Sequence, residues 1–213
     1  MPRNGLAPTS VTEAGAVLAD EIGFHQLGMG LLAERLGVRT PSLYKHVDSL
    51  ADLARRIAVL ATIELGDAIR DATQGRSGSD ALAAAARTIR MYAREHPGRY
   101  TAANSAGSSG PDDPLVAARG RLLDSFAAVL RGYQLDPGQE IHALRMLRSV
   151  IHGFATLEMA GEFQIDTDVD DSFAWVISFI DHGLRATTPA PTPHSPAAGR
   201  LRPRSPNHRA GAG

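Results

Sequence analysis

The chain of 213 residues has no cysteine, a single lysine and almost no net charge. Without cysteine there is no disulfide framework, no thiolate metal site and no cysteine nucleophile. No apolar run reaches the roughly 20 residues that a bilayer-spanning helix needs, and residues 1–7 lack the apolar centre of a signal peptide. The formal net charge of −1 also means that excess basic charge does not mark this chain as a nucleic-acid binder. We therefore expect a cytoplasmic protein that does not enter a membrane.

The composition is that of a globular protein, with 43% hydrophobic and 21% charged residues, enough for two small lobes with a core. Signals for strands are almost absent, and alanine-rich helical periodicity dominates, so we predict an all-α fold. Glycine, proline and capping residues divide the chain into about nine helices. The predicted helices cover residues 10–22, 28–36, 41–47, 49–72, 79–96, 100–107, 114–133, 137–160 and 172–185.

Residues 33–47 have the pattern of a helix-turn-helix, in which a short helix, a glycine turn and a second short helix follow one another. Thr40 is suited to cap the second helix, because its hydroxyl can accept from a free amide one turn on. Pro41 suits the first helical position, where its missing N–H has no cost. Leu43 and Val47 are four residues apart, and we expect both to pack inward.

Inward packing of those two residues leaves polar side chains on the outer face of the second helix, including Lys45, the only lysine. Hydroxyls, a phenol, a cation and an imidazole are suitable partners for phosphate oxygens and base edges. The pattern itself is loose, and an ordinary helical hairpin with a solvated face is the alternative. The predicted DNA-contacting residues are Arg39, Thr40, Ser42, Tyr44, Lys45 and His46.

The flanking segments carry helix signals of their own. Ser10 followed by Glu13 has the spacing of a capping box and predicts the start of the preceding helix, which Gly23 ends. After the pattern, Asp48-Ser49 predicts the start of a leucine-rich helix that continues to about Ala72. A helix of that length suits a connector between a small head and a larger body.

In order and spacing, these elements resemble the tetracycline-repressor (TetR) family of transcriptional regulators. The resemblance is carried by Leu32–Val38 and by Pro41–Val47, and the run Leu43-Tyr44-x-His46-Val47 is especially close to that family's recognition helix. A second stretch, residues 145–158, resembles the TetR-type regulatory domain named for a Trp-His-Gly signature. Here Val150-Ile151 precedes His152-Gly153, and no tryptophan does.

The resemblance implies a homodimeric regulator that binds a DNA operator and is released by a small-molecule effector. It also implies that Thr40, Ser42, Tyr44, Lys45 and His46 contact the DNA, Tyr44 mainly through phosphate. We expect a helix-turn-helix DNA-binding domain at residues 1–56, a ligand-binding and dimerisation domain at 57–185, and a disordered tail rich in Pro, Arg and Ala at 186–213.

Two positions depart from the family pattern. Many relatives offer hydroxyls and an arginine where this chain has Gly28-Met29-Gly30, and the usual lysine at the start of the fourth helix is Leu50. Fewer cationic contacts predict weaker non-specific binding and a shallower dependence on salt. The alternative function is therefore a ligand-sensing or interaction module whose DNA binding is weak or lost.

Two long helices near the C-terminus carry wide apolar surfaces, which predict a homodimer. The resemblance supplies the geometry, a four-helix interface in which each subunit contributes both helices. Two recognition helices about 34 Å apart would then read a palindromic operator. The alternative is that these residues form core within one chain. The residues concerned are Leu144, Leu147, Ile151 and Phe154 on the first helix, and Phe173, Trp175, Val176, Ile177, Phe179, Ile180 and Leu184 on the second.

A regulatory pocket is expected between the helices of the body, because small-molecule pockets combine aromatic and Met lining with a few polar groups. Each candidate has an alternative role as ordinary core or as a structural histidine. The candidates are Tyr92, His96, Tyr100, Phe126, Leu130, Arg145, Met146 and His152.

The sequence does not match the known catalytic and metal-binding motifs. Asp166-x-Asp168-x-Asp170 resembles the start of an EF-hand loop, but Asp171 occupies the glycine position and Ile177 the position of the closing glutamate. We expect this cluster to cap the last helix instead. No His-Glu-x-x-His, phosphate-binding glycine loop or Gly-x-Ser-x-Gly is present. The sequence therefore predicts no enzyme, no metal site and no cofactor.

Overall fold

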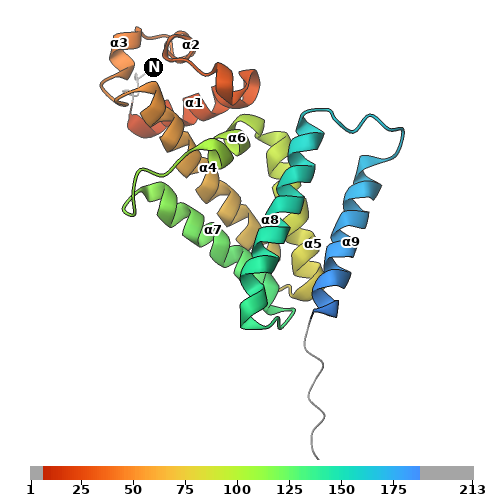
Figure 1. Ribbon diagram of the computed structural model, residues 1–213. Coiled ribbons are helices and arrows are strands. Elements are labelled where there is room, and N and C mark those ends of the chain that lie inside the picture. Colours follow the sequence, from red (N-terminus) through yellow and green to blue (C-terminus); the bar gives the residue numbers. More distant parts are fainter. Residues whose placement is uncertain (1–6, 188–213) are drawn as a thin grey trace, which may run out of the picture.

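Helices make up all the regular structure of residues 7–187, the part of the chain that the computed structural model describes (Figure 1). The all-α prediction is confirmed, and a short 3₁₀ turn, η1 (Phe24–Gln26), is the remaining element of that range. All but the first two positions of the predicted tail lie outside the described residues. The α-helices are α1 (Pro8–Ile22), α2 (Met29–Arg35), α3 (Thr40–Leu43), α4 (Leu50–Thr73), α5 (Gly78–Glu95), α6 (Pro97–Ser105), α7 (Pro114–Arg131), α8 (Pro137–Met159) and α9 (Val169–Ala186).

Helices α1 to α3 form a small head on the N-terminal end of α4, at the top of Figure 1. Leu43 and Val47 are buried against Leu32 and Leu53, as the four-residue spacing predicts. Burial of each such aliphatic side chain contributes about 1.5–3 kcal/mol. A helix as short as α3 is not stable alone, so this packing fixes its position.

Two predicted helix caps in the head are wrong. Pro8 opens α1 at the first helical position, so Ala7 is the N-cap and Ser10 lies in the first turn, where its hydroxyl accepts from the Ala7 amide at 2.9 Å. In α3 the Ser42 amide donates to the Arg39 carbonyl at 2.8 Å, so the first turn closes one residue earlier and Arg39, not Thr40, is the N-cap. In both cases the turn closes upstream of the predicted cap.

Other predicted helix ends are confirmed. Gly23, with φ 91°, ends α1. The Ser49 hydroxyl accepts from the Asp52 amide at 3.1 Å and caps α4. Asp113 caps α7 and Asp168 caps α9 through their carboxylates, so the acidic run before the last helix serves that helix.

The body is built around α4, which runs from the head downward and packs against α5, α6 and α7 (Figure 1). Helices α8 and α9 in turn pack on α5. Ile69, Leu82, Leu147 and Ile180 come from four different helices and share one buried cluster. The boundary predicted at residue 56 lies within α4, which belongs to both parts, and it stays a prediction.

Most residues predicted to form the dimer interface belong instead to the core within one chain. On α9 this holds for Phe173, Ile177, Ile180 and Leu184, and on α8 for Leu147, Ile151 and Phe154. The Phe154 and Phe173 rings lie 4.9 Å apart and close the contact between the two helices. Helical periodicity identified an apolar face correctly, but α5 already covers it. Trp175 and Phe179 are the large members of the set that stay exposed, at 66% and 67%.

The head and body meet where α6 crosses α1. Helix α6 begins at Pro97, earlier than predicted, and Gly98 then lies directly on the α1 backbone. A Cβ atom at Gly98 would lie 2.2 Å from the carbonyl of Ala19, so only glycine allows this approach. Asp20, the next residue of α1, accepts from the Arg99 amide at 2.8 Å. The head is therefore packed on α6 rather than loosely tethered.

Replacing Gly98 by alanine should destabilise the protein by about 1–3 kcal/mol, because the new methyl group would meet backbone that cannot move aside. Urea unfolding would measure the change. The control is Gly120→Ala on α7, where the added Cβ meets nothing within 4 Å. That change should stabilise the helix by about 0.5–1 kcal/mol. Stabilisation by both changes would contradict the close crossing of α6 over α1.

Candidate nucleic-acid interface and ligand cavity

A tight glycine turn sets the angle between α2 and α3. Gly37 has φ +65°, a conformation that side chains with a Cβ rarely adopt. The Val38 amide donates to the Ala33 carbonyl and the Gly37 amide to the Glu34 carbonyl, both at 3.0 Å, which closes the end of α2. The chain then enters α3 with its apolar residues directed at the head core.

The six residues predicted to contact DNA lie on and beside α3. Thr40 and Ser42 are within it, Arg39 precedes it, and Tyr44, Lys45 and His46 form the turn that follows Leu43, where the sequence had predicted helix to residue 47. Tyr44 is 51% exposed, Lys45 and Arg39 are exposed, and the other three are half-buried. None of the six side chains makes a hydrogen bond or ion pair with residues 7–187. Their donors are therefore free to meet an external partner. The half-buried members are Thr40, Ser42 and His46.

The head carries about as many acidic as basic residues, and several of its arginines are neutralised in ion pairs. Arg35 forms a two-point pair with Glu21. Arg56 lies 2.8 Å from Asp52 and donates to the His46 carbonyl at 3.0 Å, which ties α4 to the turn that follows α3. These arginines stabilise the head internally, whereas Arg39 and Lys45, which lie before and after α3, have no acidic partner among the described residues.

Arg55 is directed at the body instead. Its guanidinium donates to the Ser109 hydroxyl at 2.5 Å and lies 3.6 Å from the Asp113 carboxylate. Hydrogen bonds from the Ser109 and Leu115 amides hold the pKa of Asp113 below its usual range, so this buried side chain is anionic. The pair fastens the loop before α7 to α4.

The two positions that depart from the family pattern are both exposed. Gly30 is exposed and has open space around it. Leu50, at the start of α4, is 40% exposed. Neither position offers a side-chain hydrogen-bond donor, so any DNA contact there is limited to backbone amides and apolar atoms.

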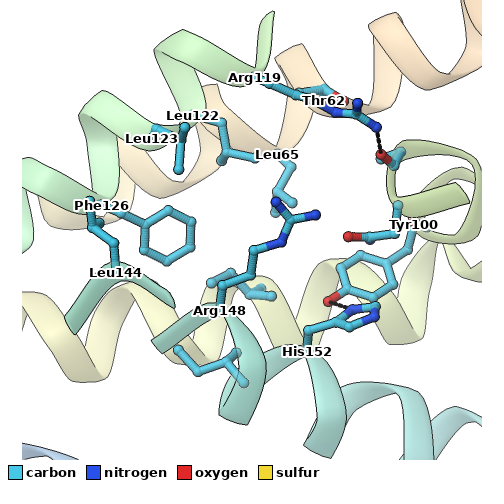
Figure 2. A pocket seen from close by; sticks show the side chains of 14 residues that line it. Thr62, Leu65, Tyr100, Arg119, Leu122, Leu123, Phe126, Leu144, Arg148 and His152 are labelled. Carbon is cyan, nitrogen blue, oxygen red and sulfur yellow. Dashed lines mark hydrogen bonds between the residues drawn. The ribbon is translucent and has the colours of Figure 1, made fainter. Parts of the chain in front are cut away.

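A cavity of about 140 Å³ lies in the body among α4, α5, α6, α7 and α8 (Figure 2). Apolar side chains form most of its wall. Its polar members come from α4, α6, α7 and α8. The lining residues are Thr62, Leu65, Ile89, Tyr100, Ala103, Asn104, Arg119, Leu122, Leu123, Phe126, Leu144, Arg148, Ile151 and His152.

Three of the predicted pocket residues, Tyr100, Phe126 and His152, line this cavity, and the other five do not. The Tyr92 hydroxyl donates to Glu64 at 2.7 Å. The remaining four lie elsewhere. His96 lies 3.3 Å from Asp20 at the head junction, Leu130 is in the core, Met146 packs against that core, and Arg145 is exposed.

The arginine of α8 that the prediction missed is Arg148. It lies four residues before His152 and four after Leu144, so all three share one helix face, and that spacing was available in the sequence. Arg119 and Asn104 carried no such signal, since only the tertiary structure brings α6 and α7 to the same cavity.

The polar end of the cavity is organised around a phenol and an imidazole. The Tyr100 hydroxyl lies 3.0 Å from Nδ1 of His152. Burial raises the pKa of Tyr100 to about 12. Burial, and then the charge of Arg148, lower the pKa of His152. At neutral pH the phenol is therefore protonated and the imidazole uncharged, so the phenol can donate to Nδ1.

Most of the other polar side chains that line the cavity are already hydrogen-bonded within the protein. Arg119 donates from Nη2 to the carbonyls of Ala103 and Ala106, at 3.0 and 2.7 Å, and so satisfies the C-terminal end of α6. The Asn104 amide donates to the Tyr100 carbonyl and the Thr62 hydroxyl to the Ala58 carbonyl. Across residues 7–187 no cluster of His, Asp or Glu is arranged to hold a metal ion.

The comparisons with known proteins agree with this geometry. Residues 82–180 match the family described as "Tetracyclin repressor-like, C-terminal domain". The chain is 34% identical over 183 residues to the HTH-type transcriptional regulator Rv0681 of Mycobacterium tuberculosis, covering 86% of this chain and 84% of that protein. It is 30% identical over 187 residues to the HTH-type transcriptional regulator YobS of Bacillus subtilis, covering 86% of this chain and 95% of that protein.

Solved structures show the same fold at lower identity. A protein from Rhodococcus sp. RHA1 has a TM-score of 0.72 at 19% identity, over 86% of this chain and 97% of its own. A TetR variant from Acinetobacter baumannii AYE, in complex with minocycline, has a TM-score of 0.65 at 20% identity, over 87% and 99%. BioQ with its natural double-stranded DNA operator has a TM-score of 0.57 at 18% identity, over 85% and 99%.

The fold places a helix-turn-helix head on a helical body with its own cavity, and the two curated relatives span both parts. The chain belongs to the TetR family of HTH-type transcriptional regulators.

Proposed function

We propose that this protein is a homodimeric repressor that binds a palindromic DNA operator through α3 and is released when a small molecule enters the cavity of the body. The observation that carries the proposal is the exposed group at the two ends of α3, where Arg39 precedes the helix, Tyr44 and Lys45 follow it, and none of the three side chains has a partner within residues 7–187. The operator seen with BioQ and the minocycline seen with the Acinetobacter regulator support the two halves of the proposal.

Helix α6 gives the cavity a direct route to the head. Tyr100 and Asn104 of this helix line the cavity. Two residues before Tyr100, Gly98 lies on the α1 backbone. A ligand that displaces α6 therefore changes the support of the head. If it binds better to a state with mis-spaced heads, linkage lowers operator affinity, typically about 5- to 150-fold.

Helix α4 gives a second route. Thr62 and Leu65 line the cavity, and at the other end of the same helix Arg56 holds the His46 carbonyl. Movement of this rigid element changes the position of α3 together with that of the head.

Exposed apolar side chains on α8 and α9 support a dimer through these two helices. Trp175 and Phe179 stack on each other with ring centroids 5.4 Å apart. On α8, Ile141 and Leu157 are also about half exposed. Large apolar groups gathered on a surface mark protein contacts. Trp175 and Phe179 belong to the set predicted from the sequence, whereas Ile141 and Leu157 are added by the structure.

The alternative is a ligand-sensing or interaction module with weak or lost DNA binding, which Gly30 and Leu50 favour because neither offers a cation to the phosphate backbone. A regulator of DNA acts where the DNA is, so we place the protein in the cytoplasm. No helix in the described part of the chain is long and apolar enough to cross a membrane. We propose no enzymatic activity.

Replacing Tyr44 and Lys45 by alanine should weaken operator binding about 10- to 100-fold, because the contacts of both side chains with phosphate groups or base edges are lost. The measurement is a gel shift with the promoter DNA that flanks the protein's own gene, at low salt. The control is Arg131→Ala, an exposed cation at the far end of α7. Unchanged affinity in the double variant would show that α3 is not the recognition helix. A folded wild-type dimer that gives no selective shift would favour the alternative function.

Replacing Trp175 and Phe179 by alanine should convert the dimer to monomer at micromolar concentration, because the stacked pair loses its contact area with the second copy. Sedimentation velocity would measure the change. The matched control is Leu31→Ala, which removes an exposed apolar side chain from the head and should leave the dimer intact. A double variant that sediments as wild type would place the interface elsewhere.

A further inference from the structure

The cavity of the body has an unbalanced charge. Its 14 lining residues include two arginines, Arg119 and Arg148, but no carboxylate. We infer that the effector is a small organic anion, a carboxylate joined to an apolar body about the size of a benzene ring. The inference rests on the proposed function, since it takes this cavity as the effector site, and it names the chemistry that the site selects.

The two arginines differ in what they already bind. Arg119 donates to two carbonyls at the end of α6, so its charge is fixed at the wall. Arg148 makes no hydrogen bond or ion pair with the described residues, and Figure 2 shows its guanidinium extending from α8 into the middle of the cavity. A guanidinium offers a planar fork of donors that matches a carboxylate at two points.

Polar and apolar groups lie at opposite ends of the cavity. Figure 2 shows Tyr100 and His152 on one side and Phe126, Leu122 and Leu144 on the other, with Arg148 between them. A ligand with an acidic head and an apolar body fits this arrangement in one orientation. Its carboxylate lies beside Arg148 and the imidazole, and its body lies against the aromatic and leucine side chains.

Other ligand classes fit less well. A cation would meet two guanidinium groups and no carboxylate. A neutral apolar molecule would gain no charge-assisted contact from Arg148, which is an exposed residue and keeps its hydration. The volume of about 140 Å³ also limits the body. An apolar protein cavity of about 150 Å³ holds one benzene molecule.

The test compares ligands of one shape and different charge on the intact wild-type dimer. Benzoate and phenylacetate are the anions, benzamide and phenylacetamide the neutral matches, and benzylamine the cation. Ligand-observed NMR titration at pH 7.5 should show the carboxylates binding about 10-fold or more tightly than the amides, because the charge-assisted pair is lost in the amide. Benzylamine should bind most weakly. Equal binding of acids and amides, or no binding of the acids at millimolar concentration, would overturn the inference.

Two arginine variants locate the contact. Arg148→Gln should lower carboxylate affinity about 10-fold or more and leave amide binding unchanged. Arg145→Gln is the matched control, because this arginine is exposed on the same helix and does not line the cavity. Thermal unfolding checks that both variants are folded. Equal losses for acid and amide in Arg148→Gln, or a loss in Arg145→Gln as large as in Arg148→Gln, would contradict the assigned role.

A parallel gel shift separates this inference from the proposed function. Carboxylates that bind through Arg148 but leave operator affinity unchanged would uphold the cavity chemistry and contradict release by an effector in this cavity. Amines or neutral compounds that bind better than the carboxylates and release the operator would support the proposed function and contradict the inference that the effector is an anion.

Discussion

The close crossing of α6 over α1 is the contact on which the rest of the molecule depends. At Gly98 two helix backbones approach so closely that no side chain fits between them, and Asp20 fixes the crossing by accepting from the next amide. The same short helix supplies Tyr100 and Asn104 to the cavity wall. One rigid element therefore borders both the head and the cavity. A packed contact of this kind is not continuously deformable, so a displacement at one end must be accommodated at the other.

The second organising feature is which cations are paired with acids and which are not. The total charge of the chain is nearly zero, so unpaired cations matter more than net charge. In the head, Arg35 and Arg56 are paired with acids of the head itself, and Arg55 is paired with Asp113 of the body. Arg39 and Lys45, on either side of α3, have no such partner within the described range. The cavity shows the same principle, since Arg119 serves the end of α6 whereas Arg148 is free of internal partners there. In both places the unpaired cation lies where an external anion can reach it.

Local rules predicted much of the fold because they act over a few residues. The inward positions of Leu43 and Val47 follow from helical spacing, and Ser49, Asp113 and Asp168 cap their helices as their side chains and positions indicate. The same rules placed Ser10 and Thr40 wrongly, because a nearby turn closed one to three residues upstream. For the cavity, the same rules predicted Tyr100, Phe126 and His152 correctly. They indicated Arg145 instead of Arg148, although Arg148 is the arginine that shares a helix face with His152.

The sequence by itself determined most of the helices and the glycine turn at Gly37, because periodicity, caps and backbone preferences are properties of neighbouring residues. Only the tertiary structure decided which apolar faces are core and which are surface. Phe173 and Trp175 are two residues apart on one helix, yet α5 and α8 cover the first and leave the second exposed. The cavity was decided in the same way, since its wall joins residues from five helices whose proximity depends on packing between distant segments.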